Sequence, residues 1–318
     1  MRKKACTVIA AALILTLAAL SVIFGGPKLT ENQFSTLKIL EIVCGCSVAY
    51  CFVVGQITQN FSQMDKLWSI LPVAYVWIIA ARGGLKLRLV IYAVIVTVWG
   101  IRLTVNFARK GAYSIKFWEG NEDYRWSIVR KNPVFRSNIA WALFNLLFIS
   151  LYQNVLVLAI CMPSLACMES AAATGIYDLV AALGSIAFLI LETVADEYQW
   201  RFHQTKKKMV AADGLLDGAA MPYSLGFNTT GPWEYMRHPN YLGEQGFWLC
   251  LYIFVIAAGV VEKGIFNWSF VGPLFLVLLF MGSSALGEAI SSGKYPQYGN
   301  YVKQVFKYLP LRRFDPNR

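Results

Sequence analysis

Ile139–Ile160 reads IAWALFNLLFISLYQNVLVLAI, 22 consecutive residues without a charged side chain. A helix needs roughly 20 predominantly apolar residues to cross the hydrocarbon core of a bilayer, so this segment predicts a membrane-spanning helix. Three further blocks have a similarly apolar character: Ala5–Phe24, Leu37–Gly55 and Ile265–Leu286. We therefore expect an all-α fold, a bundle of helices that crosses a membrane several times.

The composition of the whole chain agrees with this expectation. Of its 318 residues, 57% are hydrophobic and only 15% are charged, whereas soluble globular proteins carry about 25% charged and about 45–50% apolar residues. This balance excludes a soluble enzyme, a disordered chain and a disulfide-rich scaffold. Seven cysteines are present, most of them inside apolar blocks and none in a C-x-x-C pair, so neither a disulfide framework nor a zinc site is expected.

Eight apolar blocks are candidate membrane spans. From the N-terminus they cover residues 5–24, 37–58, 67–81, 87–107, 139–162, 171–194, 244–262 and 265–288. The third is short for a span and contains Pro72, so we expect it to be tilted or broken. The first follows the basic start Met1–Lys4 and is either a cleaved signal peptide or a retained helix. Its length, and the lack of a clear small-x-small cleavage site, favour a retained helix.

The distribution of positive charge predicts the topology. If the N-terminus is cytoplasmic, 22 of the 29 Lys and Arg residues fall on the cytoplasmic side and five on the opposite side, as the positive-inside rule describes. We therefore expect both termini in the cytoplasm, with the basic loop 82–88 as an exception. The host membrane would be the endoplasmic reticulum in a eukaryote or the inner membrane in a bacterium. The sequon Asn228-Thr229-Thr230 would stay unmodified.

The net charge of +11 has the same origin. In a membrane protein an excess of Lys and Arg reflects cytoplasmic loops and attraction to anionic lipid. An anionic small ligand is the second interpretation, and no nucleic-acid partner is expected.

Charged residues inside apolar blocks are functional hypotheses, because a charge in the membrane is costly. Arg102 and Asn106 lie one helical turn apart in VWGIRLTVNFAR, and Glu192 and Asp196 lie one turn apart in ETVADEYQWRF. Each pair could bind a ligand, or make an interhelical contact or a headgroup-level charge. For the isolated Glu41 and Asp178, which also lie in apolar surroundings, we favour the structural interpretation.

The densest group of polar side chains lies in Gly231–Glu244, which reads GPWEYMRHPNYLGE. Pro239 predicts a helix start, and Gly243 permits the close approach of another backbone. A helix N-terminus offers free N–H groups and partial positive charge to an anion, and an arginine adds a bidentate donor. The candidate binding residues of this segment are Arg237, His238, Asn240, Tyr241 and Glu244.

Asn240 and Glu244 would share one face of that helix. A carboxylate does not bind phosphate, so Glu244 suits ribose hydroxyls or an amide. The structural alternative is an interfacial cap whose aromatic anchors are Trp233, Tyr235 and Tyr241.

Several familiar catalytic sites are absent. His203 and His238 are the two histidines of the chain, too few for a histidine-rich iron or zinc cluster. There is no Walker A motif and no G-x-G-x-x-G after a strand, so a nucleotide would have to be held by helix ends and loops. We expect no metal.

The R-H-P-N-Y-x-G-E core resembles the C-terminal region of steroid 5-alpha-reductase-like membrane proteins, and more closely a branch of that superfamily known only as a domain of unknown function. The R-H-P-N-Y motif taken by itself would also be shared with sterol reductases and with isoprenylcysteine carboxyl methyltransferases. Four further segments match the branch: Met64–Trp77, Val98–Arg109, Glu192–Phe202 and Lys294–Lys303. The resemblance runs from about residue 60 to 310, which suggests N-terminal helices over 1–60 and a reductase-like domain over 61–318.

The resemblance implies seven to ten transmembrane helices with a cytosol-facing NADPH pocket in the C-terminal half. In such reductases hydride passes from NADPH to an activated C=C bond of a lipid in the bilayer, here a steroid-, sterol- or polyprenoid-like substrate.

It also suggests cofactor contacts, without assigning a catalytic residue. Asn240 and Glu244 match the nicotinamide-end and ribose contacts, and Trp248 matches the aromatic residue just beyond. Asp196, with Glu192 one turn before it, matches the acidic position at the adenine side. The remaining candidates are Arg237 and His238 near the phosphates, Arg201 and Lys206–Lys208 for the 2′-phosphate, and Arg102, Asn106, Tyr241 and Tyr298 in the matching segments.

The chain departs from the branch after Glu288, where Ala289-Ile290-Ser291 stands in place of a basic pair. Two other functions therefore stay open. One is an S-adenosylmethionine-dependent lipid or prenylcysteine methyltransferase, although such enzymes usually carry a Glu-Glu pair where Glu288 stands alone. The other is a non-catalytic lipid-binding membrane protein.

Overall fold

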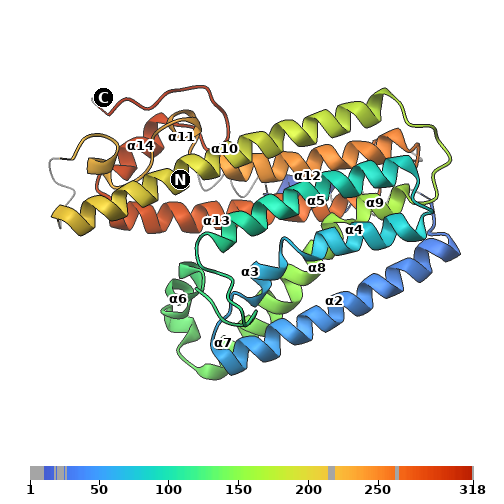
Figure 1. Ribbon diagram of the computed structural model, residues 1–318, viewed down its shortest axis with the longest axis horizontal. Coiled ribbons are helices and arrows are strands. Elements are labelled where there is room, and N and C mark those ends of the chain that lie inside the picture. The colour runs from blue at the N-terminus through green and yellow to red at the C-terminus, as the bar shows by residue number, and fades with distance from the viewer. Residues whose placement is uncertain are drawn as a thin grey trace. The chain divides into compact units, whose positions relative to one another are not determined.

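The computed structural model describes residues 11–17, 19, 25, 27–213, 219–261 and 265–316 (Figure 1). Within them the chain is helical and forms no β-sheet, which confirms the expected all-α class. Met1–Lys4 and most of the first predicted span, residues 5–24, lie outside the described residues, and so does the choice between signal peptide and retained helix.

The chain forms two compact units. The first contains residues 1–182 and 250–276, and the second contains residues 183–249 and 277–318. The predicted boundary after residue 60 falls inside the first unit.

Between residues 31 and 167, all of them described, the first unit contains ten helical segments. They are α2 (Glu31–Thr58), α3 (Gln63–Leu67), α4 (Leu71–Arg82), α5 (Leu87–Ala108), α6 (Tyr124–Arg130), η1 (Pro133–Phe135), α7 (Asn138–Phe144), η2 (Asn145–Tyr152), α8 (Gln153–Ile160) and α9 (Met162–Cys167). The short helix η4 (Trp268–Phe270) also belongs to this unit. Figure 1 shows α4 alongside α5, and the two helices pack against each other. A capping box of Thr30 and Gln33 starts α2.

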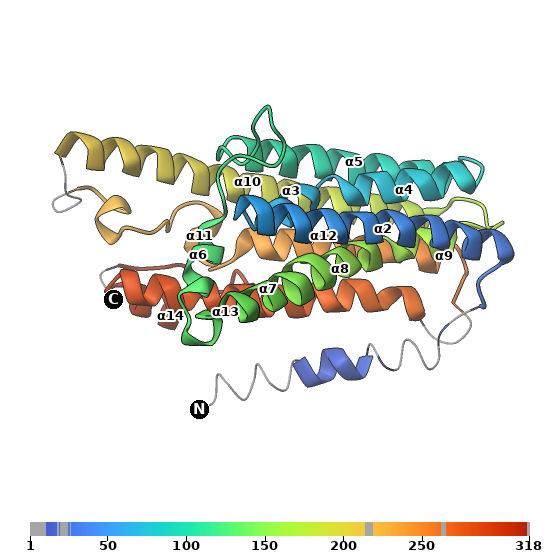
Figure 2. The same ribbon diagram turned by 90° about the horizontal axis from the view of Figure 1, so that it is seen from below.

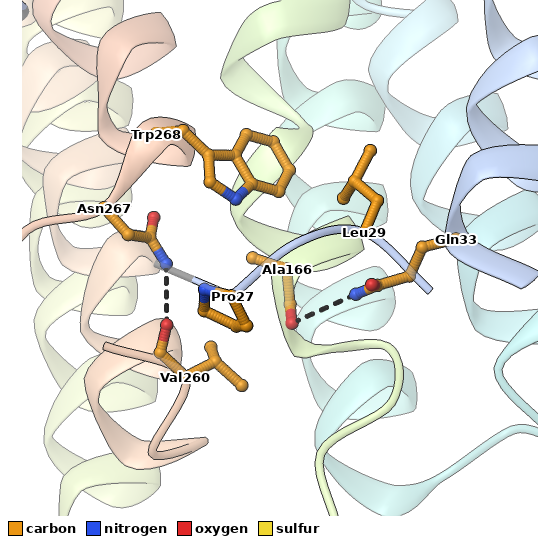
Figure 3. A pocket seen from close by; sticks show the side chains of 7 residues that line it. All are labelled: Pro27, Leu29, Gln33, Ala166, Val260, Asn267 and Trp268. Carbon is orange, nitrogen blue, oxygen red and sulfur yellow. Dashed lines mark hydrogen bonds between the residues drawn. The ribbon is translucent and has the colours of Figure 1, made fainter. Parts of the chain in front are cut away.

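The second unit is built from parts of three long helices and from the C-terminal segment. The long helices are α10 (Ile176–Asp213), α12 (Pro239–Ala257) and α13 (Val271–Lys294), and the short ones are η3 (Tyr223–Leu225), α11 (Pro232–Tyr235) and α14 (Tyr298–Gln304). Figure 2 shows α14 beside the C-terminal part of α13. A buried apolar cluster forms the core here, with members Phe227, Tyr298, Tyr301, Val305 and Phe314.

Among the described residues, five helical segments are long and apolar enough to cross a membrane: 31–58, 87–108, 138–167, 176–211 and 268–294. Each overlaps a predicted span, so the chain is a multi-pass membrane protein. The predicted block 67–81 is divided, because residues 68–70 form a turn and Pro72 lies in the first turn of α4. A proline is tolerated there since the first N–H groups of a helix have no intrahelical partner. The predicted block 244–262 corresponds to α12, which begins five residues earlier.

The exceptional basic loop 82–88 is explained by its contacts. Arg88 donates from Nε to Asp178 Oδ1 at 2.6 Å and from Nη2 to Asp178 Oδ2 at 3.1 Å. Both side chains are buried, with 5% and 6% exposed. Arg88 Nη2 also donates to the carbonyl of Ala257 at 3.2 Å, and Lys86 Nζ donates to that of Met168 at 3.0 Å. These cations therefore satisfy internal acceptors, and the structural interpretation of Asp178 holds.

We expect Asp178→Asn to destabilise the protein strongly. The substitution leaves the buried Arg88 guanidinium without its counter-charge, and removal of one partner of a buried ion pair typically lowers the free energy of unfolding by about 3–5 kcal/mol. Thermal unfolding of detergent-purified protein would measure the change. Glu169→Gln, an exposed site that accepts from Asn32, is the matched control. Equal melting temperatures for Asp178→Asn and wild type would contradict this account.

Candidate functional site

The sequence segment Gly231–Glu244 is held in place by the C-terminal tail. After α11, Met236 is extended, and residues 236–238 lie beside residues 306–307. Met236 and Phe306 form a parallel bridge, Arg237 N donates to Phe306 O at 3.0 Å, and His238 N donates to Lys307 O at 3.1 Å. Because α12 begins at the next residue, this pairing sets the position of its N-terminus.

Tyr301 also forms hydrogen bonds to this segment. Its hydroxyl donates to the carbonyls of Met236, at 3.1 Å, and of Trp233, and the ring is 1% exposed. Phe314 N donates to Glu234 O at 2.9 Å, which adds a second tail contact. The segment 231–238 is thus fixed by main-chain and tyrosine hydrogen bonds from residues more than sixty positions later in the chain.

Glu288 joins the two basic side chains of the motif. Its Oε1 accepts from Arg237 Nε at 2.9 Å and lies 3.0 Å from His238 Nε2. All three side chains are mostly buried, with 10%, 11% and 17% exposed for Arg237, His238 and Glu288. Arg237 Nη1 donates to the carbonyls of Val302, at 3.4 Å, and Val305. The Arg237 guanidinium is therefore already engaged inside the protein.

Sequence reasoning missed Glu288 as a member of this site. The residues of the motif lie near each other in the chain, whereas Glu288 lies on α13, about fifty residues after Arg237 and His238. Glu192 and Asp196 became candidates because they are acidic residues at the end of an apolar block. Glu288 has the same kind of position, so the same criterion could have identified it.

His238 is neutral at physiological pH, because burial lowers its pKa from the ordinary value of 6.5 more than the nearby Glu288 raises it. Since a carboxylate only accepts hydrogen bonds, the neutral ring carries its proton on Nε2 toward Glu288. The ring stacks on Tyr241 with centroids 5.1 Å apart and planes at 16°. His238 is thus oriented by a carboxylate on one side and a tyrosine ring on the other.

Two predicted residue pairs face each other: Glu192 and Asp196 on α10, and Asn240 and Glu244 on α12. Asn240 Nδ2 donates to Asp196 Oδ1 at 3.1 Å. Glu192 and Glu244 are both 4% exposed. A Cβ added at Gly243 would come within 2.6 Å of the Glu192 Cβ, so a glycine is needed for this close approach. The structure therefore brings together four residues that the sequence predicted as two separate pairs.

Trp248 closes this group at the next turn of α12. Its Nε1 donates to Glu244 Oε1 at 3.0 Å, and the side chain is fully buried. The indole holds the Glu244 carboxylate in one orientation, which gives the predicted aromatic residue a positioning role.

The other predicted residues occupy different surroundings. Tyr298 is 6% exposed and belongs to the apolar cluster of α14. Arg201 is 78% exposed and pairs with Glu197 at 2.7 Å on the surface of α10. Lys206 donates to the Gly226 carbonyl at 2.6 Å, whereas Lys207 and Lys208 are exposed.

Arg102 and Asn106 lie on α5 in the first unit. Asn106 is 9% exposed, and its Oδ1 accepts from Arg109 Nε at 3.0 Å. The sequon residue Asn228 is also buried, with 4% exposed. Within the described part of the chain, His, Cys, Asp and Glu side chains form no group of three that could hold a metal ion.

Acidification should destabilise the protein through His238. As the pH falls through about 6.5, the unfolded chain takes up a proton that the folded His238 resists, so the free energy of unfolding decreases. Between pH 7.5 and 5.5 the melting temperature of wild type should therefore fall more than that of His238→Gln. His203→Gln, at the exposed second histidine, should keep the wild-type pH dependence. Identical pH profiles for wild type and His238→Gln would exclude this site as the cause.

Comparisons with known proteins are consistent with one family. The chain is 32% identical over 277 residues to an uncharacterized protein of the fission yeast Schizosaccharomyces pombe, which covers 81% of this chain and 77% of the relative. No solved structure matches the chain. Residues 51–305, most of the chain and all of the residues of α10 and α12, match the family described as "Protein of unknown function (DUF1295)", and this multi-pass membrane protein therefore belongs to that family.

Proposed function

We propose that this membrane protein is an NADPH-dependent reductase that transfers hydride to a C=C bond of a steroid-, sterol- or polyprenoid-like lipid in the bilayer. The observation that carries the proposal is the group formed by Glu192 and Asp196 on α10 with Asn240 and Glu244 on α12. Glu192 and Glu244 are buried, and Asp196 and Asn240 are half-buried. Amide and carboxylate groups so placed suit the hydroxyl and amide groups of a dinucleotide. The R-H-P-N-Y-x-G-E core and its resemblance to steroid 5-alpha-reductase-like proteins support the choice of cofactor.

The residues of this group fit the neutral parts of the cofactor. Asn240 offers an amide that can both donate and accept, and Glu244 offers a carboxylate that accepts from hydroxyl or amide groups. Trp248 holds that carboxylate, as its hydrogen bond of 3.0 Å shows. In this proposal Asn240 and Glu244 orient the nicotinamide and its ribose, and NADPH, when bound, supplies the hydride.

The phosphates require a different set of residues from the one that the motif suggests. Arg237 is paired with Glu288 and with two carbonyls, so it holds the segment in shape rather than facing a phosphate directly. The exposed cations of α10 remain available. Arg201, Lys207 and Lys208 follow Asp196 on the same helix, about 8–18 Å further along its axis. The Arg201–Glu197 pair is exposed, and such surface pairs contribute little stability, so it can open for an anion.

Asn240→Ala and Glu244→Gln should weaken NADPH binding. Each change leaves polar groups of the bound cofactor without a partner, which costs about 1–3 kcal/mol and corresponds to roughly five- to 150-fold in affinity. Titration of NADPH into detergent-purified variants of matched thermal stability would measure the loss, and Glu169→Gln should bind like wild type. Wild-type affinity in both site variants would remove this helix face from the site.

Lys207→Gln/Lys208→Gln should reduce the preference for NADPH over NADH. If these lysines face the 2′-phosphate, their loss removes charge-assisted hydrogen bonds and lowers NADPH affinity by about tenfold or more, while NADH affinity stays unchanged. Titrations of both cofactors with the same purified variant provide the measurement. An equal loss of affinity for NADPH and NADH would show that the lysines do not face the 2′-phosphate.

The cofactor itself can be tested by thermal unfolding. A ligand that binds only the folded protein stabilises it by about 2.7 kcal/mol at a hundredfold excess over its Kd. NADPH should therefore raise the melting temperature, and S-adenosylmethionine should not. Stabilisation by S-adenosylmethionine alone would replace the reductase proposal with the methyltransferase.

A further inference from the structure

The connection between α5 and α7 in the first unit carries a surface that the proposed reductase does not use. Within residues 131–139, two cations alternate with two large apolar side chains, all of them exposed: Lys131, Val134, Arg136 and Ile139. Val134 is 70% exposed and Ile139 is 75% exposed. We refer to residues 131–139 as the basic apolar segment.

The cations of this segment have no carboxylate partner among the described residues. The acidic residues of the same connection are otherwise engaged. Asp123 pairs with Arg125 at 2.8 Å, Glu119 pairs with Lys116 at 3.2 Å, and Glu122 accepts from the Phe61 N–H at 2.7 Å. Lys131 and Arg136 take part in no ion pair within the described residues. Two uncompensated positive charges therefore remain on the surface.

The backbone of the segment has a defined hydrogen-bonded structure. Asn132 Oδ1 caps η1 by accepting from Val134 N at 3.1 Å, and Ser137 Oγ caps α7 by accepting from Ala140 N at 3.0 Å. Phe135 packs against Phe144 with ring centroids 4.6 Å apart. The side chains that point outward are thus presented by a fixed backbone.

Helix α6, which ends just before the segment, is held to the rest of the first unit by two further contacts. Trp126 of α6 is buried, and its Nε1 donates to Asp65 Oδ2 at 2.7 Å. The Arg130 guanidinium lies over the ring of Trp141 at 5.4 Å and donates to Gln59 Oε1 at 3.1 Å. Figures 1 and 2 both show α6 close to the beginning of α7.

The position of the segment identifies its surroundings. A membrane-spanning segment begins at Asn138, so the basic apolar segment lies where that span enters the bilayer. Cations immediately outside a span attract anionic lipid headgroups, and exposed apolar side chains at that level insert beside the acyl chains. A soluble anion would gain from the charges alone and would leave Val134 and Ile139 in water.

We propose that the basic apolar segment is a binding site for the headgroup of an anionic phospholipid, with Lys131 and Arg136 contacting the phosphate and Val134 and Ile139 the adjoining acyl chains. This proposal does not depend on the proposed cofactor or on the proposed reaction.

Lys131→Gln/Arg136→Gln should weaken binding of phosphatidylserine. Each cation near a membrane surface contributes about 1 kcal/mol, which corresponds to about fivefold in affinity per residue and about 25-fold for the pair. Native mass spectrometry of the full-length protein in detergent, titrated with phosphatidylserine, would measure the apparent Kd of the first bound lipid. Lys303→Gln/Arg312→Gln removes two exposed cations from the C-terminal region and should bind like wild type.

Three outcomes would overturn the proposal. They are wild-type affinity in the Lys131/Arg136 variant, an equal loss in the Lys303/Arg312 control, and displacement of the lipid by inorganic phosphate, which would indicate a site for soluble anions. Val134→Ser/Ile139→Ser provides a second test that keeps all charges. It should weaken phosphatidylserine and phosphatidylcholine alike, because it removes contacts to acyl chains that both lipids share. Both variants are compared at matched melting temperature, so that misfolding is not read as lost binding.

Discussion

The carboxylate of Glu288 organises the second unit, because a buried charge is stable only when oppositely charged and polar groups surround it. Arg237 and His238 both bond to the same oxygen of Glu288. Their main chains pair with the C-terminal tail, so the ion pair, the tail and the start of α12 form one connected structure. These contacts determine the position of the residues at the beginning of α12. A site on α12 therefore depends on a carboxylate from α13 that need not touch any ligand.

The same electrostatic constraint operates in the first unit. Arg88 is buried against Asp178, and Lys66, fully buried, donates to the carbonyls of Phe117 and Glu119 at 2.7 and 2.6 Å. Arg88 and Lys66 therefore bind acceptors inside the protein, whereas Lys131 and Arg136 take part in no ion pair within the described residues. The distinction matters for function, since only the second kind can meet an anion. A count of positive charges by loop treats both kinds alike, which is why the loop 82–88 looked like an exception to the positive-inside rule.

The helices were largely predictable, and the differences have local causes. The predicted block 87–107 is α5, from Leu87 to Ala108. The block 37–58 begins earlier, at Glu31, because the polar residues Thr30 and Gln33 form a capping box and hydropathy alone does not register a cap. The block 67–81 is split by a turn at residues 68–70. Where the apolar character is uniform, as in Asn138–Cys167, the sequence does not reveal that residues 145–152 are π-helical.

For the candidate site, helical spacing groups residues that lie one turn apart, but it does not connect residues that are far apart in the chain. The one-turn spacing of Asn240 and Glu244, and of Glu192 and Asp196, follows from helix geometry, so it was determined by the sequence, as were the membrane class and most spans. Only the tertiary structure decided that these two pairs face each other. The close approach of the two helices is possible because Gly243 has no Cβ atom. The tertiary structure also decided that Arg237 and His238 turn toward Glu288, about fifty residues away. A hydropathy pattern specifies how much of a helix is apolar, but a charged side chain takes its partner from whichever helix the packing places beside it.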